Sequence, residues 1–395
     1  MQQPEREEMS MNFPVANAVT RFRRTHAPRE VLAELLHDAE IAINGNHPWD
    51  IQVHDERAFS RFLAEGTLGL GEAYMGGLWD CEALDTFICK TLHARMESKI
   101  SWRRLAWPYL MARLVNLQSP SRAFEVGEKH YDLGNDLFEA MLDKRMVYSC
   151  AYWRDTNDLD QAQEKKLDLI CRKLHLESGM RLLDIGCGWG SLAQYAAENY
   201  GVSVVGVTIS KEQVVLARER CAGLPVEIRL QDYRDLNEPF DRIVSVGMFE
   251  HVGYKNYRRF LQVVQRCLRR PEDLFLLHTI GRRKTAYHFD PWMAKYVFPN
   301  GQLPSAAQIA QAADGMMVIE DWHNFGADYD RTLLAWYRNF ETAWPQLEEK
   351  YGERFWRMWR YYLLTCAGTF RARYNHLWQV VLSGAGTPGG YVPVR

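Results

Sequence analysis

The sequence predicts an α/β protein with a mostly parallel β-sheet, preceded by a smaller, mainly helical α+β unit. After residue 121, short apolar or β-branched runs alternate with helical stretches, whereas the first 118 residues show no such alternation. This alternation requires a parallel sheet covered by helices on both faces. At 395 residues with ordinary globular composition, the chain has room for two domains. We expect them at 1–118 and 119–395.

Charge and composition exclude several classes of protein. The formal net charge is −2, so no overall positive field favours nucleic acid, and we expect no such partner. The N-terminus has no apolar signal-peptide core, and no run approaches the roughly 20 apolar residues that span a bilayer. Eight cysteines lack CxxC or metal-type spacing. We therefore expect a cytoplasmic protein without a metal site or a disulfide framework.

The N-terminal region shows little chemistry. Helical periodicity runs through 31–42, and 42–54 resembles two short strands around an Asn-Gly turn. The glycine-rich stretch 68–80 is expected to be a connector. At 99–117, Trp102, Trp107 and Tyr109 alternate with lysine and arginine before a Ser-Pro-Ser break. This segment is the best candidate for a domain linker. It suits either a lipid headgroup interface or an ordinary helix packed between domains.

Five runs are expected to form the parallel sheet. They lie at 181–188, 202–210, 226–230, 242–248 and 273–280, with helical stretches such as 191–201 and 211–223 between them. Ligands on sheets of this type bind outside the carboxyl ends of the strands, where the strand order reverses. A functional site is therefore expected at that edge.

The strongest local motif is DIGCGWG at 184–190, which ends the first strand and opens a helix. Glycines allow close approach of a ligand to the backbone, and the helix N-terminus offers free N–H groups to a carboxylate. Asp184 can stabilise an ammonium group. A dinucleotide loop would place a third glycine where this chain has Ser191. The motif therefore favours a nucleoside-like ligand, and a plain tight turn is the alternative.

Several further motifs reveal a family resemblance. The second strand is followed by GVTISKEQ at 206–213, without the acidic residue that often binds ribose hydroxyls. The other motifs, in chain order, are HYDLGNDLF at 130–138, YSCAYW at 148–153, MFEHVG at 248–253, LLHTIG at 276–281, FGADYDRTLLAWY at 325–337 and CAGTFRAR at 366–373. With them the chain resembles cyclopropane-fatty-acyl-phospholipid synthases. The resemblance is dense over 121–385 and looser before it.

The resemblance implies a class I S-adenosylmethionine-dependent methyltransferase with a seven-stranded sheet. It implies methyl transfer from S-adenosylmethionine to the cis double bond of an unsaturated acyl chain in a membrane phospholipid. A cyclopropane ring then forms by deprotonation of a carbocation, with bound bicarbonate as the base. The ligands of the bicarbonate carried over from the family are Cys150, Glu250, His278, Ile280 through its main chain, and Tyr329.

Residue chemistry supports this implication. An alkene is a weak nucleophile, so the sulfonium methyl must be held in line with it in a dry cavity. Glu250 follows the fourth predicted strand, and His278 and Ile280 follow the fifth, so all three are expected at the same sheet edge. Glu250 and His278 also have purely structural explanations. Glu250 suits a helix start, and His278 suits a core position.

The remaining catalytic candidates are two cysteines and a tyrosine. Cys150 and Tyr329 can equally be packed core residues. Cys366 matches a family cysteine proposed as a nucleophile. Direct attack of an alkene on a sulfonium needs no covalent enzyme intermediate, so we interpret Cys366 as a packing residue.

The resemblance also implies contacts to S-adenosylmethionine. These candidates are Tyr148, Ser149, Asp184, Gly186, Cys187, Gly188, Gly190, Thr208, Gln213, Asp232 and Tyr233. Tyr233 is expected near the adenine, although relatives often have tryptophan there. The aromatic helices after residue 329 are expected to cover the acyl chain, and an ordinary amphipathic pair is equally consistent with their pattern.

The expected substrate lies inside a bilayer, so we expect transient contact with the inner face of the membrane through the N-terminal unit and the basic aromatic linker. The family analogy also suggests a homodimer. Three alternatives remain. A heteroatom methyltransferase would share the loop and sheet, a methyl- or methylene-branching enzyme would share nearly every motif, and a lipid-binding protein could keep the fold without activity.

Overall fold

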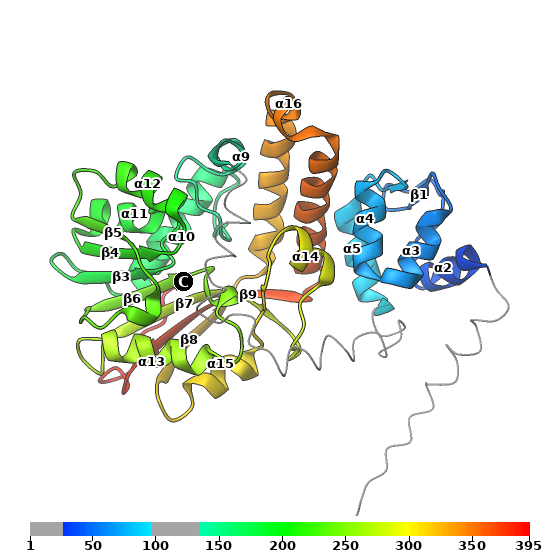
Figure 1. The fold of residues 1–395 in the computed structure, drawn as a ribbon. Coiled ribbons are helices and arrows are strands. Elements are labelled where there is room, and N and C mark those ends of the chain that lie inside the picture. The colour runs from blue at the N-terminus through cyan, green and yellow to red at the C-terminus, as the bar shows by residue number, and fades with distance from the viewer. Residues whose placement is uncertain (1–26, 97–133) are drawn as a thin grey trace, which may run out of the picture.

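The computed structural model describes residues 27–96 and 134–395. The linker at 99–117, the expected boundary at residue 118 and the first four residues of HYDLGNDLF lie outside the described residues. Figure 1 shows a sheet with helices above and below it, the long helix α16 beside it, and a small helical unit on the far side of α16.

A seven-stranded sheet forms the centre of the larger part, in the order β5-β4-β3-β6-β7-β9-β8. β3 to β7 are parallel to one another, and β9 runs antiparallel to both β7 and β8. The strands are β3 (Arg181–Ile185), β4 (Ser203–Thr208), β5 (Val226–Leu230), β6 (Arg242–Val246), β7 (Leu274–Arg282), β8 (Val318–Asn324) and β9 (Asn375–Ser383). All five predicted strands are present. The expectation of a mostly parallel sheet is confirmed.

Each face of this sheet buries its own apolar core. Neighbouring strand residues point to opposite faces, so Leu182 packs in one core and Leu183 in the other. The first core lies under α10 (Leu159–Lys173), α11 (Ser191–Tyr200) and α12 (Lys211–Arg220). The second lies under α13 (Tyr257–Cys267) and α15 (Ala306–Ala313). Burial on both faces explains why these strands are apolar at nearly every position.

The N-terminal unit corrects two sequence-based expectations. The Asn-Gly turn does not join two strands, because β1 (Gln52–Val53) pairs instead with β2 (Trp79–Asp80). The stretch expected to be a connector is mostly α4 (Thr67–Met75). Glycine is tolerated in this helix because the missing Cβ atom lets a neighbouring side chain pack directly against the helix backbone. A Cβ on Gly71 would clash with the ring of Trp292. The other helices of the unit are α2 (Pro28–His37), α3 (Arg57–Glu65) and α5 (Leu84–His93).

The long α16 (Ala327–Arg371) joins the two parts. It bends at Gly352, whose φ is 74°, and so forms two arms. One continuous apolar core contains side chains of the N-terminal unit, of α9 (Asn135–Met141), of α14 (Pro291–Tyr296) and of both arms. Among the described residues no helix, α16 included, is both long and apolar enough to span a membrane.

Arg357 of α16 is a buried polar tie between the two parts. Its Nε donates to the carbonyl oxygen of Tyr74 at 2.6 Å, and its Nη2 donates to that of Trp79 at 3.1 Å and to the Asp80 carboxylate. We expect Arg357→Met to lower the free energy of unfolding by about 2–4 kcal/mol, because buried acceptors lose their donor. Urea denaturation measures this change. The exposed neighbour Arg354→Met is the control, and an equal loss in both variants would contradict the prediction.

Candidate active site

A pocket lies at the carboxyl ends of β3, β4, β5 and β6, where the strand order reverses between β3 and β6. This is the edge at which the sequence predicted a site. Its lining comes mainly from residues 146–149, 184–189, 207–210, 231–234 and 246–248. Thus four strand ends and the segment before α10 build one concave surface.

The glycine motif shapes the floor of this pocket. Gly186, Gly188 and Gly190 all have positive φ, between 55° and 84°, which side chains other than glycine rarely adopt. Gly186 also lies against Met248, so a Cβ there would meet that side chain. Asp184 is buried, and burial raises the pKa of its carboxyl to about 7. A cationic ligand group would offset that cost.

Ten of the eleven predicted cofactor contacts line the pocket. The exception is Gly190, which instead forms the left-handed N-cap of α11. The Thr208 hydroxyl donates to Gln213 Oε1 at 2.9 Å, so these two polar side chains are paired in the wall of the pocket at the end of β4. Asp232 accepts from the backbone N–H of Arg234 at 2.9 Å. Tyr233 is buried, and its ring packs on Phe260, 5.2 Å between centroids.

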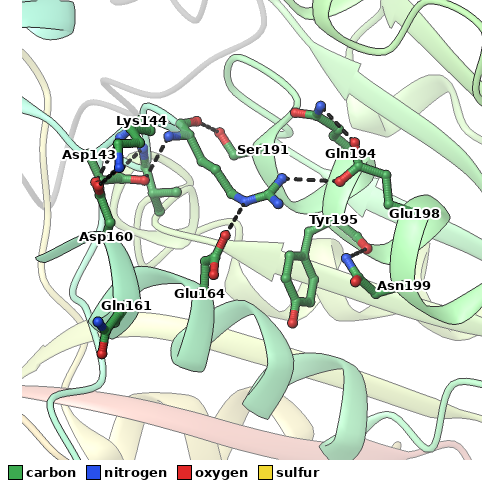
Figure 2. A network of polar contacts seen from close by, with 12 residues as sticks. Asp143, Lys144, Asp160, Gln161, Glu164, Ser191, Gln194, Tyr195, Glu198 and Asn199 are labelled. Atoms are coloured by element: carbon green, nitrogen blue, oxygen red, sulfur yellow. Dashed lines mark hydrogen bonds and ion pairs between the residues drawn. The ribbon is translucent and has the colours of Figure 1, made fainter. Parts of the chain in front are cut away.

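The segment 143–150 carries Tyr148 and Ser149 into the pocket, and a polar network holds it in place (Figure 2). Asp143 accepts from the backbone N–H groups of Arg145 and Val147 at 2.9 and 2.8 Å. The Arg145 side chain bridges Glu164 of α10 and Glu198 of α11, at 3.0 and 3.2 Å. This network fixes the segment against two helices of the sheet.

Next to the pocket lies a second group of residues, which we call the inner cluster: Cys150, Glu250, His278, Ile280, Tyr329 and Cys366. None of the six lines the pocket itself. Glu250 sits in the 3₁₀ turn Phe249–His251 and is buried, with Oε1 accepting from the Ile280 N–H at 2.6 Å. Burial raises the pKa of Glu250 to about 7. Its Oε2 is buried and has no hydrogen-bond partner.

His278 and Ile280 lie inside β7 rather than after it, which corrects the predicted strand end. β7 is longer than its parallel neighbours because β9 pairs along its whole length. His278 pairs in register with Val246, the last residue of β6, and so still lies level with the carboxyl edge. Gln379 Nε2 donates to His278 Nδ1 at 3.3 Å, whereas His278 Nε2 is buried without a partner.

Tyr329 connects the remaining members of the inner cluster. Burial is the main cause that raises its pKa well above the ordinary value, and the nearby Cys150, Glu250 and Cys366 raise it further. The structure therefore brings these groups within electrostatic reach of one another. Burial also raises the pKa of both thiols, that of Cys366 to about 12. Neither cysteine is a ready thiolate nucleophile in this protein.

Sequence reasoning missed three residues that contribute to this region. Lys166 and His251 line the pocket, and His251 stays neutral because burial lowers its pKa to about 4. Thr332 of α16 accepts from the Ala151 N–H at 3.1 Å and so ties the Cys150 segment to α16. A signal existed for Lys166, since it falls on the buried face of α10. His251 and Thr332 lay within quoted motifs but were not singled out.

The strand order, the glycine loop after the first parallel strand and the pocket at the switch point define a class I S-adenosylmethionine-dependent methyltransferase. The family model for mycolic acid cyclopropane synthetase matches residues 118–380. The chain belongs to this family.

Individual relatives agree with this assignment. A cyclopropane-fatty-acyl-phospholipid synthase of Escherichia coli K12 is 60% identical over 355 residues, which cover 89% of this chain and 92% of the relative. The tuberculostearic acid methyltransferase UfaA1 of Mycobacterium tuberculosis is 32% identical over 401 residues, which cover 95% of this chain and 92% of the relative. The solved mycolic acid cyclopropane synthase CmaA1, in complex with SAH and CTAB, superposes with a TM-score of 0.61 at 33% identity, covering 66% of this chain and 98% of that one.

Glu250 makes a pH-dependent contribution to stability. Its folded pKa of about 7 lies above the ordinary 4.5, so the unfolded chain binds fewer protons between these values and wild-type stability falls as pH rises through them. Glu250→Gln removes this titration. We expect its free energy of unfolding, relative to wild type, to rise by about 2–3 kcal/mol from pH 5 to pH 8.

Urea denaturation at both pH values measures this difference. Glu349→Gln, which changes an exposed carboxylate, is the control and should show no comparable rise. If the difference in free energy of unfolding between wild type and Glu250→Gln is the same at both pH values, the pKa of Glu250 is not raised by burial.

Proposed function

We propose that this enzyme transfers the methyl carbon of S-adenosylmethionine to the cis double bond of an unsaturated acyl chain in a membrane phospholipid, and closes a cyclopropane ring with bicarbonate as the base. The observation that carries the proposal is the pair of buried, unpartnered polar atoms in the inner cluster, Glu250 Oε2 and His278 Nε2. Buried polar groups without partners in a folded protein point to a missing ligand. They stand next to the cofactor pocket, where the base would be needed.

The chemistry of these side chains fits a bicarbonate ion. Burial lowers the pKa of His278 well below its ordinary value, so its ring is neutral. With Nδ1 accepting from Gln379, its remaining proton lies on Nε2, which is then a donor that needs an acceptor. Burial raises the pKa of Glu250 to about 7, so its carboxyl can carry a proton near neutral pH. Both groups can therefore donate to an anion, and bound bicarbonate would supply a base that does not trap a carbocation.

The cofactor contacts are proposed on the same basis. When bound, S-adenosylmethionine supplies an electrophilic methyl group on a cationic sulfur. We propose that Asp184 offsets the charge of its ammonium group and that Thr208 and Gln213 bind the ribose. The proposal is supported by the position of all three side chains in the lining of the pocket. Tyr148 separates the pocket from α16, with its hydroxyl 2.8 Å from that of Tyr362.

The reaction balances as follows. The alkene π electrons form a bond to the methyl carbon, the carbon–sulfur bond breaks, and its electrons stay on sulfur. A C–H bond of the new methyl group then supplies the electrons that close the ring, and its proton passes to the base. The buried aromatic rings around Tyr329, including Trp336 and Phe370, exclude water and favour a cationic centre.

The substrate and partners are also proposals. We propose that the N-terminal region to residue 118 and the basic aromatic linker contact the inner membrane surface, that 119–395 carry out catalysis, and that the two arms of α16 cover the acyl chain. The arms present buried aromatic side chains to the shared core, which suits a hydrocarbon. A homodimer remains a proposal from family analogy.

The activity is tested with enzyme, S-adenosylmethionine and vesicles of cis-monounsaturated phospholipid. We expect an acyl product heavier by one CH₂ group and saturated at the former double bond, found by gas chromatography and mass spectrometry. Glu250→Gln should lower the rate by about 100-fold or more, and bicarbonate depletion should lower that of the wild type. Glu349→Gln is the control.

Other products would contradict parts of the proposal. A methylated headgroup would indicate a heteroatom methyltransferase, and a methyl-branched chain would leave methyl transfer intact but refute ring closure. An unchanged lipid would indicate a binding protein. If the rate does not depend on bicarbonate, bicarbonate is not the base, and the rest of the proposal stands.

The membrane contact has a separate test. We expect the Trp102→Ala/Trp107→Ala double variant to co-sediment several-fold less with anionic phospholipid vesicles, because indole rings favour the headgroup interface. Thermal denaturation checks that the variant folds. Undiminished sedimentation would refute this role of the linker.

A further inference from the structure

Lys166 is a buried cation on the wall between the cofactor pocket and the inner cluster. It is 1% exposed and lines the pocket. Its Nζ donates to the hydroxyl of Ser149 at 2.9 Å. Ser149 lies between Tyr148, which also lines the pocket, and Cys150 of the inner cluster. A single side chain thus reaches the segment that separates the two parts of the site.

The charge of Lys166 has no contacting counter-ion. No carboxylate among the described residues lies within 4.0 Å of its Nζ. Burial lowers the pKa of Lys166 to about 8, so it remains mostly protonated at neutral pH. Asp143 and Asp184 act on it only from farther away, and burial raises the pKa of both carboxyls. A buried, unpaired ammonium group is costly unless a bound anion offsets it.

Another buried lysine shows the contrast. Lys173, about two turns further along α10, lies 3.0 Å from His323 Nδ1 and 3.9 Å from the carboxylate of Asp321. Asp321 in turn binds Arg395 through both carboxylate oxygens. Lys173 therefore has a carboxylate within ion-pair distance, which it shares with Arg395, whereas Lys166 has none among the described residues.

The proposed bicarbonate ion needs a nearby positive charge to offset its own negative charge. His278 is neutral, and burial keeps the Cys150 thiol and the Tyr329 phenol protonated by raising their pKa. None of these groups brings a positive charge to a bound anion. The field of Lys166 reaches the inner cluster: its charge partly opposes the burial that raises the pKa of Cys150, and together with burial and Lys173 it lowers the pKa of His278.

We propose that Lys166 is a positioning residue that supplies the counter-charge for an anion bound in the inner cluster and, through Ser149, fixes the segment between that anion and the cofactor. This inference rests on the proposed function for the identity of the anion, bicarbonate. It adds a residue that does not touch the anion but makes its binding favourable.

The test measures bicarbonate binding directly, without turnover. Calorimetric titrations of bicarbonate into full-length enzyme saturated with S-adenosylhomocysteine would compare wild type, Lys166→Met and Lys166→Gln. Methionine removes the charge and the hydrogen bond, whereas glutamine removes the charge but keeps a donor for Ser149. The control is Lys165→Met, whose partly exposed ammonium group donates only to the carbonyl oxygens of Arg154 and Asp155.

We expect both Lys166 variants to bind bicarbonate at least about tenfold more weakly, with less than about threefold change in affinity for S-adenosylhomocysteine. Lys165→Met should match wild type. Recovery of bicarbonate binding in Lys166→Gln would refute the counter-charge, because that variant keeps only a donor for Ser149. Unchanged binding in either folded variant would refute the inference, and if Lys166→Met fails to fold, Lys166→Gln decides. Absence of bicarbonate binding by wild type would instead refute the proposed base.

Discussion

The attachment of the segment from Asp143 to Trp153 is the constraint on which the rest of the site depends. On one side α10 holds it, since Gln163 donates to the carbonyl oxygens of Val147 and Ser149 at 3.2 and 2.9 Å. On the other side Thr332 of α16 accepts from the indole N–H of Trp153 at 2.9 Å. The segment can therefore present one side to the cofactor pocket and the other to the inner cluster.

Burial determines the electrostatics of both halves of the site. Asp184 and Glu250 lie in places where water cannot stabilise their charge, so both carboxyls have a pKa near 7. Without ligands, a site of this kind holds buried polar groups that lack a counter-charge or a hydrogen-bond partner. Ligands that bring charge and hydrogen bonds supply what these groups lack. We propose that this cost in the unliganded fold favours binding of the cationic cofactor and of the proposed small anion.

Much of the fold and the pocket could be predicted because local rules determine them. Apolar runs with intervening helices specify the parallel sheet, and the chain's glycines at 186, 188 and 190 occupy left-handed conformations that few other residues adopt. Prediction failed where long-range pairing decided the outcome. Gln52 pairs with Asp80 rather than within a local hairpin, and β7 extends past Ile280 because β9 lies beside it.

The sequence by itself determined the sheet, the glycine loop and the residue types available for chemistry, because periodicity, turn conformation and side-chain type are local properties. Only the tertiary structure decided that Glu250, from the turn after β6, accepts a hydrogen bond from Ile280 of β7 and lies within electrostatic reach of Tyr329 of α16. It also decided that Lys166 is buried without a contacting counter-ion. Those facts depend on contacts between residues of different strands and helices and on the exclusion of water. Neither can be read from spacing along the chain.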